Sequence, residues 1–122
     1  MARFAAILLA LWALLPLSAA ADTYLLMAEQ TGCSWCKRWN AEIADIYPKT
    51  VEGQTAPLRR YDIHGDEPVI TFVNRVHFTP TFILVQDGHE VGRMEGYAGE
   101  DFFWGLLNKM LENAKIPLDH SG

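Results

Sequence analysis

The two cysteines of the chain, Cys33 and Cys36, are separated by two residues. A short apolar run from Tyr24 to Ala28 and a polar loop precede them, and apolar residues at helical spacing follow, so the pair lies where a helix begins. At a helix N-terminus, unpaired backbone N–H groups and the positive end of the macrodipole favour a thiolate over a thiol. We therefore predict that Cys33 is the attacking nucleophile, and that Cys36, one turn later and more shielded, is the resolving thiol.

Three other uses of a cysteine pair stay open. A structural disulfide that closes so short a loop removes little conformational entropy from the unfolded chain, so it would be a poor crosslink. A structural zinc ion needs about four ligands, and the 4 histidines show no paired spacing. Copper(I) can bind two thiolates. The sequence favours a redox pair with no cofactor and no resident metal, and it keeps a copper or zinc chaperone as the alternative from another functional class.

The residues around the cysteines give weaker indications. Trp35, between the cysteines, is expected to be exposed, because Cys36 and Trp39 mark the buried side of the helix. An exposed indole there would either contact a partner or pack locally. Lys37 and Arg38 would either add positive potential near the sulfurs or form an ordinary solvated helix face.

Four strands are expected to position this pair. The strands are predicted from composition and apolar runs over residues 24–28, 58–63, 81–85 and 89–94. Asp87-Gly88 is a turn signal, and it predicts that the last two strands form a hairpin.

Three helices are expected between and after these strands. The first runs from Cys33 to about Tyr47, just before a proline, and polar sequence follows it as far as Pro57. The second begins at Asp66 or Glu67, and the last begins at Glu100 or Asp101. The second has a proline in its first turn, and its predicted buried face is Val69, Phe72, Val73 and Val76. The last helix has a wide apolar face made by Phe102, Phe103, Leu106, Leu107, Met110 and Leu111. The order βαβαββα predicts an α/β fold in which helices cover one mixed sheet.

These features together resemble the thioredoxin superfamily: Cys-x-x-Cys at a helix start, Thr79-Pro80-Thr81 before a strand, and a hairpin followed by a terminal helix. The resemblance covers nearly all of residues 22–122. It implies a central mixed four-stranded sheet flanked by helices, a cis Thr79–Pro80 bond and a position for Pro80 beside the cysteines. The Thr79 backbone would then pair with an extended substrate peptide. Trp35, Thr79 and Pro80 are therefore the expected substrate-binding residues.

Four stretches are similar, more narrowly, to the SoxS family, the small periplasmic thioredoxins of bacterial sulfur-oxidation (Sox) clusters. They are residues 29–36, 39–43, 47–50 and 56–59. That family is thought to keep thiols reduced on the carrier protein that holds thiosulfate-derived sulfur. The similarity implies a monomeric reductant that a membrane thiol transporter recharges, because the compartment is oxidising. A general disulfide oxidase or isomerase would use the same residues, so that direction of reaction stays open.

Two departures from general thioredoxins affect the chemistry. Ser34-Trp35 replaces the Gly-Pro that thioredoxins carry between their cysteines, so a redox potential cannot be carried over. Thioredoxins also keep a buried aspartate six residues before the first cysteine, as the proton acceptor for the resolving thiol, and here that residue is Met27. Glu29 is the nearest acid, and it would be either a substitute acceptor or a solvated loop carboxylate.

The N-terminal segment predicts export. Arg3 is its one charge, Phe4 to Leu17 is almost wholly apolar, and small residues follow at 18–21. This run is shorter than the roughly 20 residues that span a bilayer, so we interpret residues 1–21 as a cleavable signal peptide and 22–122 as one thioredoxin-like domain. The formal net charge of −5 and the scattered basic residues argue against nucleic-acid binding.

Overall fold

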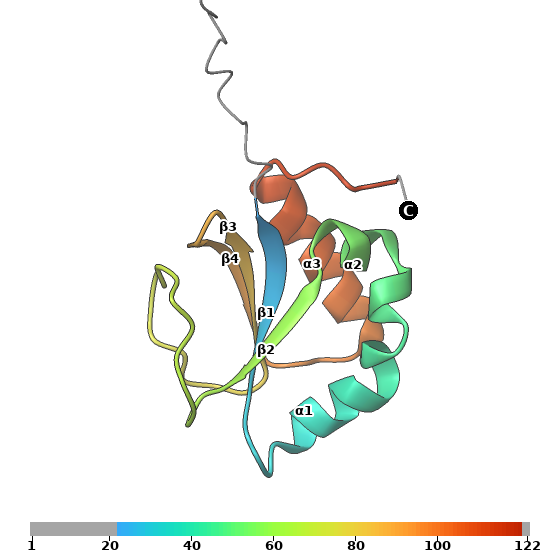
Figure 1. The fold of residues 1–122 in the computed structure, drawn as a ribbon. Helices are drawn as coiled ribbons and strands as arrows, with labels where there is room; N and C mark the ends of the chain where they lie inside the picture. The colour runs from blue at the N-terminus through green and yellow to red at the C-terminus, as the bar shows by residue number, and fades with distance from the viewer. Residues whose placement is uncertain (1–21, 121–122) are drawn as a thin grey trace, which may run out of the picture.

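The computed structural model describes residues 22–120, which form a four-stranded sheet in the order β2-β1-β3-β4 (Figure 1). The strands are β1 (Thr23–Glu29), β2 (Leu58–Asp62), β3 (Thr81–Gln86) and β4 (His89–Glu95). β1 pairs in parallel with β2 and antiparallel with β3, and β3 pairs antiparallel with β4. The sheet is therefore mixed, as the sequence predicts.

The central strands are buried on both faces. In β1 the five residues from Tyr24 to Ala28 are buried, and in β3 the five from Thr81 to Val85 are. Side chains alternate between the two faces of β1. Met27 packs in the apolar cluster that contains Trp39, and Leu26 packs in a second cluster, against which Ile70 and Phe72 of the β2–β3 loop lie. Continuous apolar runs of this kind are typical of strands covered on both sides.

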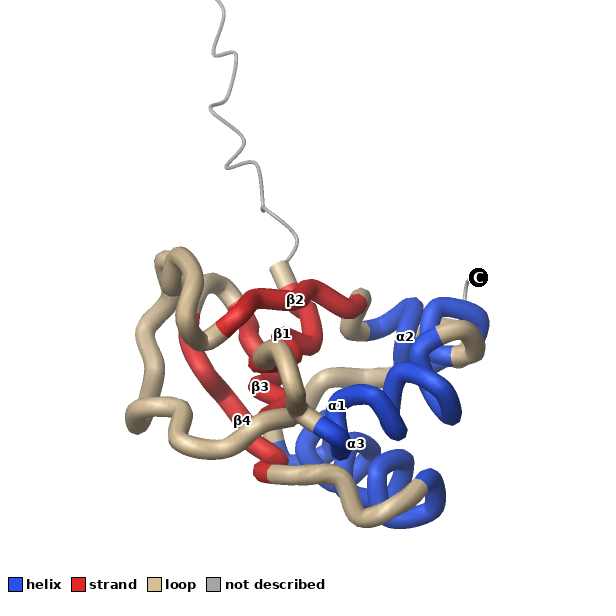
Figure 2. Tube along the Cα trace, turned by 90° about the horizontal axis from the view of Figure 1, so that it is seen from below, coloured by secondary structure: helices blue, strands red, loops and turns tan. Residues whose placement is uncertain are grey.

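All of the described helices cover one face of this sheet, and the loop between β2 and β3 covers the other (Figure 2). The helical elements are α1 (Ser34–Trp39), the π-helical turn η1 (Asn40–Ala44), the 3₁₀ helix η2 (Tyr47–Lys49), α2 (Val51–Thr55) and α3 (Glu100–Asn113). Within residues 22–120, none of the helices is long and apolar enough to cross a membrane.

The helix predicted from Asp66 or Glu67 to Val76 is wrong, because this segment is an irregular loop in the structure. Val69 is fully exposed, and only some of the apolar residues reach the sheet. The main chain finds its partners on β4 instead of within a helix. Arg93 donates to the carbonyls of residues 74 and 75 at 2.7 and 3.0 Å, and Glu90 accepts from the N–H of Val73 at 3.0 Å. The predicted order βαβαββα therefore loses its middle helix.

The segment between β1 and β2 also differs from the prediction. The expected single helix from Cys33 to Tyr47 changes to a π-helical turn after Trp39, and the expected polar loop contains α2. Thr50 starts α2 as its N-cap, because its Oγ1 accepts from the N–H of Gly53 at 3.0 Å. Two short α-helices, one wider π-helical turn and one tighter 3₁₀ turn thus replace one regular helix.

The last helix begins where the sequence predicts, but its buried face is narrower. Phe102 and Leu106 are exposed, whereas Phe103 and Leu107 are buried in the core. Beyond the helix, Ile116 and Leu118 pack on the core, so the chain stays docked on the domain as far as Leu118. The predicted signal peptide, residues 1–21, lies outside the described residues.

Candidate active site

Cys33 and Cys36 form a disulfide, with their Cα atoms 5.2 Å apart. Cys33 is the N-cap of α1, and its Sγ accepts a hydrogen bond from the N–H of Cys36 at 3.1 Å. A backbone donor therefore points at the Cys33 sulfur. A donor in this position favours negative charge on that sulfur once the disulfide is reduced.

The two sulfurs differ in exposure. Cys36 is 4% exposed and belongs to the core cluster around Trp39, whereas Cys33 is only partly buried. The shielding of Cys36 agrees with the sequence prediction, as does the exposure of Trp35 at 51%. A large partner can therefore reach Cys33 more readily than Cys36.

A cavity of about 420 Å³ opens beside the pair. Besides the two cysteines, its lining residues are Glu29, Gln30, Gly32, Ser34, Lys37 and Asn40. Lys37 thus lies at the cavity, whereas Arg38 pairs with Glu42 at 2.7 Å and stands over the Trp35 ring. The two basic residues after the cysteines have different surroundings, which their adjacency in the sequence does not reveal.

The acid in this cavity is Glu29, the last residue of β1. Its carboxylate pairs with the Arg60 guanidinium of β2 at 2.8 Å, and its side chain is partly buried. The same guanidinium lies 3.5 Å from the Met27 sulfur and over the Trp39 ring. Glu29 is therefore an ion-paired residue at the end of β1 that lines the cysteine cavity.

The loop that precedes β3 contacts the cysteine loop through one side chain. The Thr79–Pro80 bond is cis, the isomer expected from the resemblance. Pro80 is buried, and Gln30 Nε2 donates to Thr79 Oγ1 at 2.7 Å. The structure thus brings Thr79 to the segment that carries Cys33. The hydrogen bond between Gln30 and Thr79 was not predicted, because no local pattern signals a contact across 49 residues.

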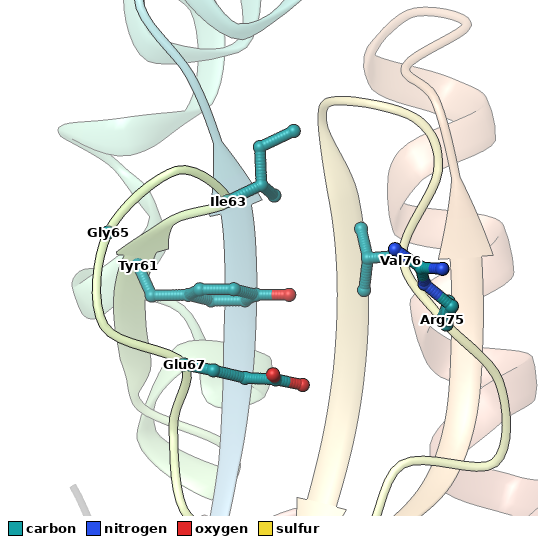
Figure 3. Close-up of a pocket in the computed structure, with 6 residues that line it drawn as sticks. All are labelled: Tyr61, Ile63, Gly65, Glu67, Arg75 and Val76. Carbon is teal, nitrogen blue, oxygen red and sulfur yellow. The ribbon is translucent and has the colours of Figure 1, made fainter.

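A second cavity, of about 210 Å³, lies between β2 and the β2–β3 loop (Figure 3). Its lining residues are Tyr61, Ile63, Gly65, Glu67, Arg75 and Val76. Burial, reinforced by the nearby charge of Glu67, raises the pKa of Tyr61, so its phenol stays protonated. This cavity has no nucleophile or thiol, and the candidate active site is the cysteine cavity. Among the described residues, no group of three or more His, Cys, Asp and Glu side chains is arranged to hold a metal ion.

The unequal exposure predicts unequal reactivity. In the reduced protein, iodoacetamide is expected to modify Cys33 at least about tenfold faster than Cys36, because Cys33 is accessible and receives a backbone donor. Peptide mapping after partial alkylation measures the two rates. Faster modification of Cys36 would reverse the assigned roles.

Comparison with known proteins gives two matches that agree. Residues 17–111 match the family described as a thioredoxin-like domain. Among solved structures, the chain is similar to the periplasmic thioredoxin SoxS from Paracoccus pantotrophus in its reduced form, with a TM-score of 0.74 and 47% identity. That match covers 76% of this chain and 99% of the other. No curated protein sequence matches the chain.

The predicted superfamily and the predicted similarity to SoxS are therefore both confirmed. The four-stranded mixed sheet flanked by helices is the fold that this family implies. The disulfide supplies its chemistry. The chain belongs to the thioredoxin-like family, and it is a thiol-disulfide oxidoreductase whose redox pair is Cys33 and Cys36.

Proposed function

We propose that the protein is a periplasmic reductant that keeps the thiol of a sulfur-carrier protein reduced during thiosulfate oxidation. The observation that carries this proposal is the 47% identity to a periplasmic SoxS thioredoxin over 99% of that chain. The oxidoreductase chemistry is common to the whole family. The choice of partner is specific to the SoxS relatives and rests on this identity.

In the proposed reaction the reduced protein meets an oxidised carrier, whose cysteine is bonded to a second sulfur. The Cys33 thiolate attacks one sulfur of that bond, so a mixed disulfide forms and the other sulfur leaves as a thiolate or thiol. Cys36 then loses its proton and attacks Cys33, which releases the second thiol of the partner. Two electrons pass to the partner, and the Cys33–Cys36 disulfide seen in the structure is the product.

Trp35, Thr79 and Pro80 are the proposed substrate-binding residues. The indole of Trp35 is half exposed next to Cys33, so an apolar side chain of the partner can pack on it. Thr79 lies at the cysteine loop through its contact with Gln30. Its main chain would pair with an extended segment around the partner's cysteine.

The proposal includes a periplasmic location for the protein and a donor that reduces its disulfide. Residues 1–21 would be the signal peptide, and 22–122 would work in the periplasm as a monomer. Because that compartment is oxidising, each turnover leaves a disulfide that must be reduced again. A membrane thiol transporter fed from the cytoplasm is the proposed electron donor.

The direction of the reaction is tested by the reduction potential of the pair. Because the proposed protein donates electrons, equilibration with known dithiol couples is expected to give a reduction potential below that of glutaredoxins, about −200 to −230 mV. A value near that of strongly oxidising disulfide-forming enzymes, about −120 mV, would support a general oxidase or isomerase instead. Protein that carries stoichiometric copper or zinc under reducing conditions and lacks disulfide reductase activity would be a metal chaperone.

A further inference from the structure

Gln30 joins three segments that are distant in the sequence. Its main-chain oxygen accepts from the N–H of Cys33 at 3.3 Å. Its side-chain Nε2 donates to Thr79 Oγ1 at 2.7 Å, and its Oε1 lies 3.0 Å from His64 Nε2. One residue therefore links the cysteine loop, the turn after β2 and the loop before β3.

The hydrogen-bond directions in this link are fixed by the amide. Because the Gln30 NH₂ group donates to Thr79, the amide oxygen must accept the hydrogen that His64 Nε2 carries. The neutral tautomer with hydrogen on Nε2 and the imidazolium both supply that hydrogen, so the link does not depend on the charge of His64. The main-chain N–H of His64 donates to Asp62 Oδ1 at 2.8 Å, so the residue that bonds to the Gln30 amide oxygen is itself held at the end of β2.

Side chains from other segments hold the loop that ends at Thr79. Residues 63–80 contain no helix or strand, and Phe78 and Val73 are exposed. Arg93 holds the middle of the loop by donating to the carbonyls of residues 74 and 75. Near its end, Thr81 Oγ1 donates to the Phe78 carbonyl at 2.6 Å, and Gln30 is the residue that joins the loop to the cysteine segment, through Thr79. A binding loop that is held in place before the substrate arrives loses less conformational entropy on binding.

We propose that Gln30 is a positioning residue that holds the Thr79 main chain at the cysteine loop, and that this gives the enzyme its preference for extended peptide disulfides over small disulfides. The inference rests on the proposed role of Thr79 in substrate binding. Gln30 acts through Thr79 and takes no part in electron transfer.

Two variants of Gln30 distinguish the effect of its side-chain hydrogen bonds from the effect of its side-chain size. Gln30→Met keeps the length of the side chain and removes both hydrogen bonds. Gln30→Glu restores them, because a carboxylate accepts from His64 and also from the Thr79 hydroxyl. Gln54→Met, an exposed site on α2, is the matched control.

The probes are two disulfides that release the same coloured thiolate from the reduced protein. One is 5,5′-dithiobis(2-nitrobenzoate), and the other is an extended peptide whose single cysteine is bonded to 2-nitro-5-thiobenzoate. Gln30→Met is expected to lower the ratio of peptide to small-disulfide rate constants by about tenfold, the scale of one or two lost hydrogen bonds. Gln30→Glu and Gln54→Met are expected to give ratios within about twofold of the wild type.

A second site tests whether Gln30 works through Thr79. Thr79→Val keeps the shape and removes the hydroxyl, so it is expected to lower the same ratio. Both changes break the same hydrogen bond, the one between Gln30 and Thr79. The double variant Gln30→Met/Thr79→Val is therefore expected to have a rate ratio no lower than that of the more impaired single variant.

Distinct results would overturn the inference and the proposed function. A wild-type protein that releases no thiolate from either probe would refute the oxidoreductase chemistry. A wild-type protein that reacts with the peptide no faster than with the small disulfide would refute the proposed substrate groove. If the wild type prefers the peptide and Gln30→Met keeps that ratio, or if the two variants are additive, the positioning role alone is wrong.

Discussion

Replacing Cys36 with serine is expected to leave a protein that attacks disulfides but does not release its partner. Cys33 remains accessible and still receives a backbone donor from residue 36. The chain has 2 cysteines, so no other thiol can attack the mixed disulfide from within. When the reduced variant meets a protein disulfide with no other thiol present, release of the partner's second thiol is expected to slow by about a thousandfold or more, the scale seen when a group that forms or breaks bonds is removed. Single-turnover kinetics and non-reducing electrophoresis, both without added reductant, measure the slow release and the accumulated mixed disulfide.

The matched control for that variant is Cys33→Ser. It also lacks turnover, but it is expected to accumulate little mixed disulfide, because the remaining thiol at Cys36 is 4% exposed. Equal accumulation in both variants would mean that either cysteine can attack. The assignment of nucleophile and resolving thiol would then be wrong.

Replacing Gly53 with alanine is expected to have the largest effect on stability. Gly53 is buried in α2, and an added Cβ would lie 1.8 Å from the carbonyl oxygen of Tyr47. The obstacle is backbone and cannot rotate away. Tyr47 is itself held, since it is fully buried and its hydroxyl donates to the Ala56 carbonyl at 2.6 Å. We expect the free energy of unfolding to fall by about 2 to 4 kcal/mol, a large share of the stability of a small domain.

The control for Gly53 lies on the last helix. Gly105 is exposed in α3, and an added Cβ would meet nothing within 4 Å. Gly105→Ala is expected to raise the free energy of unfolding by about 0.5 to 1 kcal/mol, because alanine loses less backbone entropy in a helix. Urea denaturation of both variants makes the comparison. A Gly53→Ala protein as stable as the wild type would contradict the prediction. It would mean that η2 can move away from α2 with little loss of folding free energy.

Features carried by local sequence could be predicted. The four strands follow from apolar runs and from the Asp87-Gly88 turn, and the place of the cysteine pair at a helix start follows from the apolar spacing of the residues after it. The exposure of Trp35 also follows locally, because Cys36 and Trp39 occupy the buried side of α1.

Features decided by distant partners could not be predicted. The apolar spacing of residues 66–76 suits a helix, but Arg93 and Glu90 of β4 bind the main chain of the segment and hold it as a loop. The environment of Glu29 likewise depends on Arg60, which the parallel pairing of β1 and β2 brings near. Each of these contacts joins side chains or main chain separated by more than a dozen residues.

The central claim is tested most directly by identifying what Cys36→Ser captures in the periplasm of the native organism. Mixed disulfides would be purified through a tag on the variant, released with reductant and identified by mass spectrometry, with Cys33→Ser as the background. We predict that one sulfur-carrier protein with an exposed cysteine dominates the Cys36→Ser sample. Capture of many unrelated secreted proteins, with no enrichment of such a carrier, would contradict the proposed function and identify a general disulfide oxidase or isomerase.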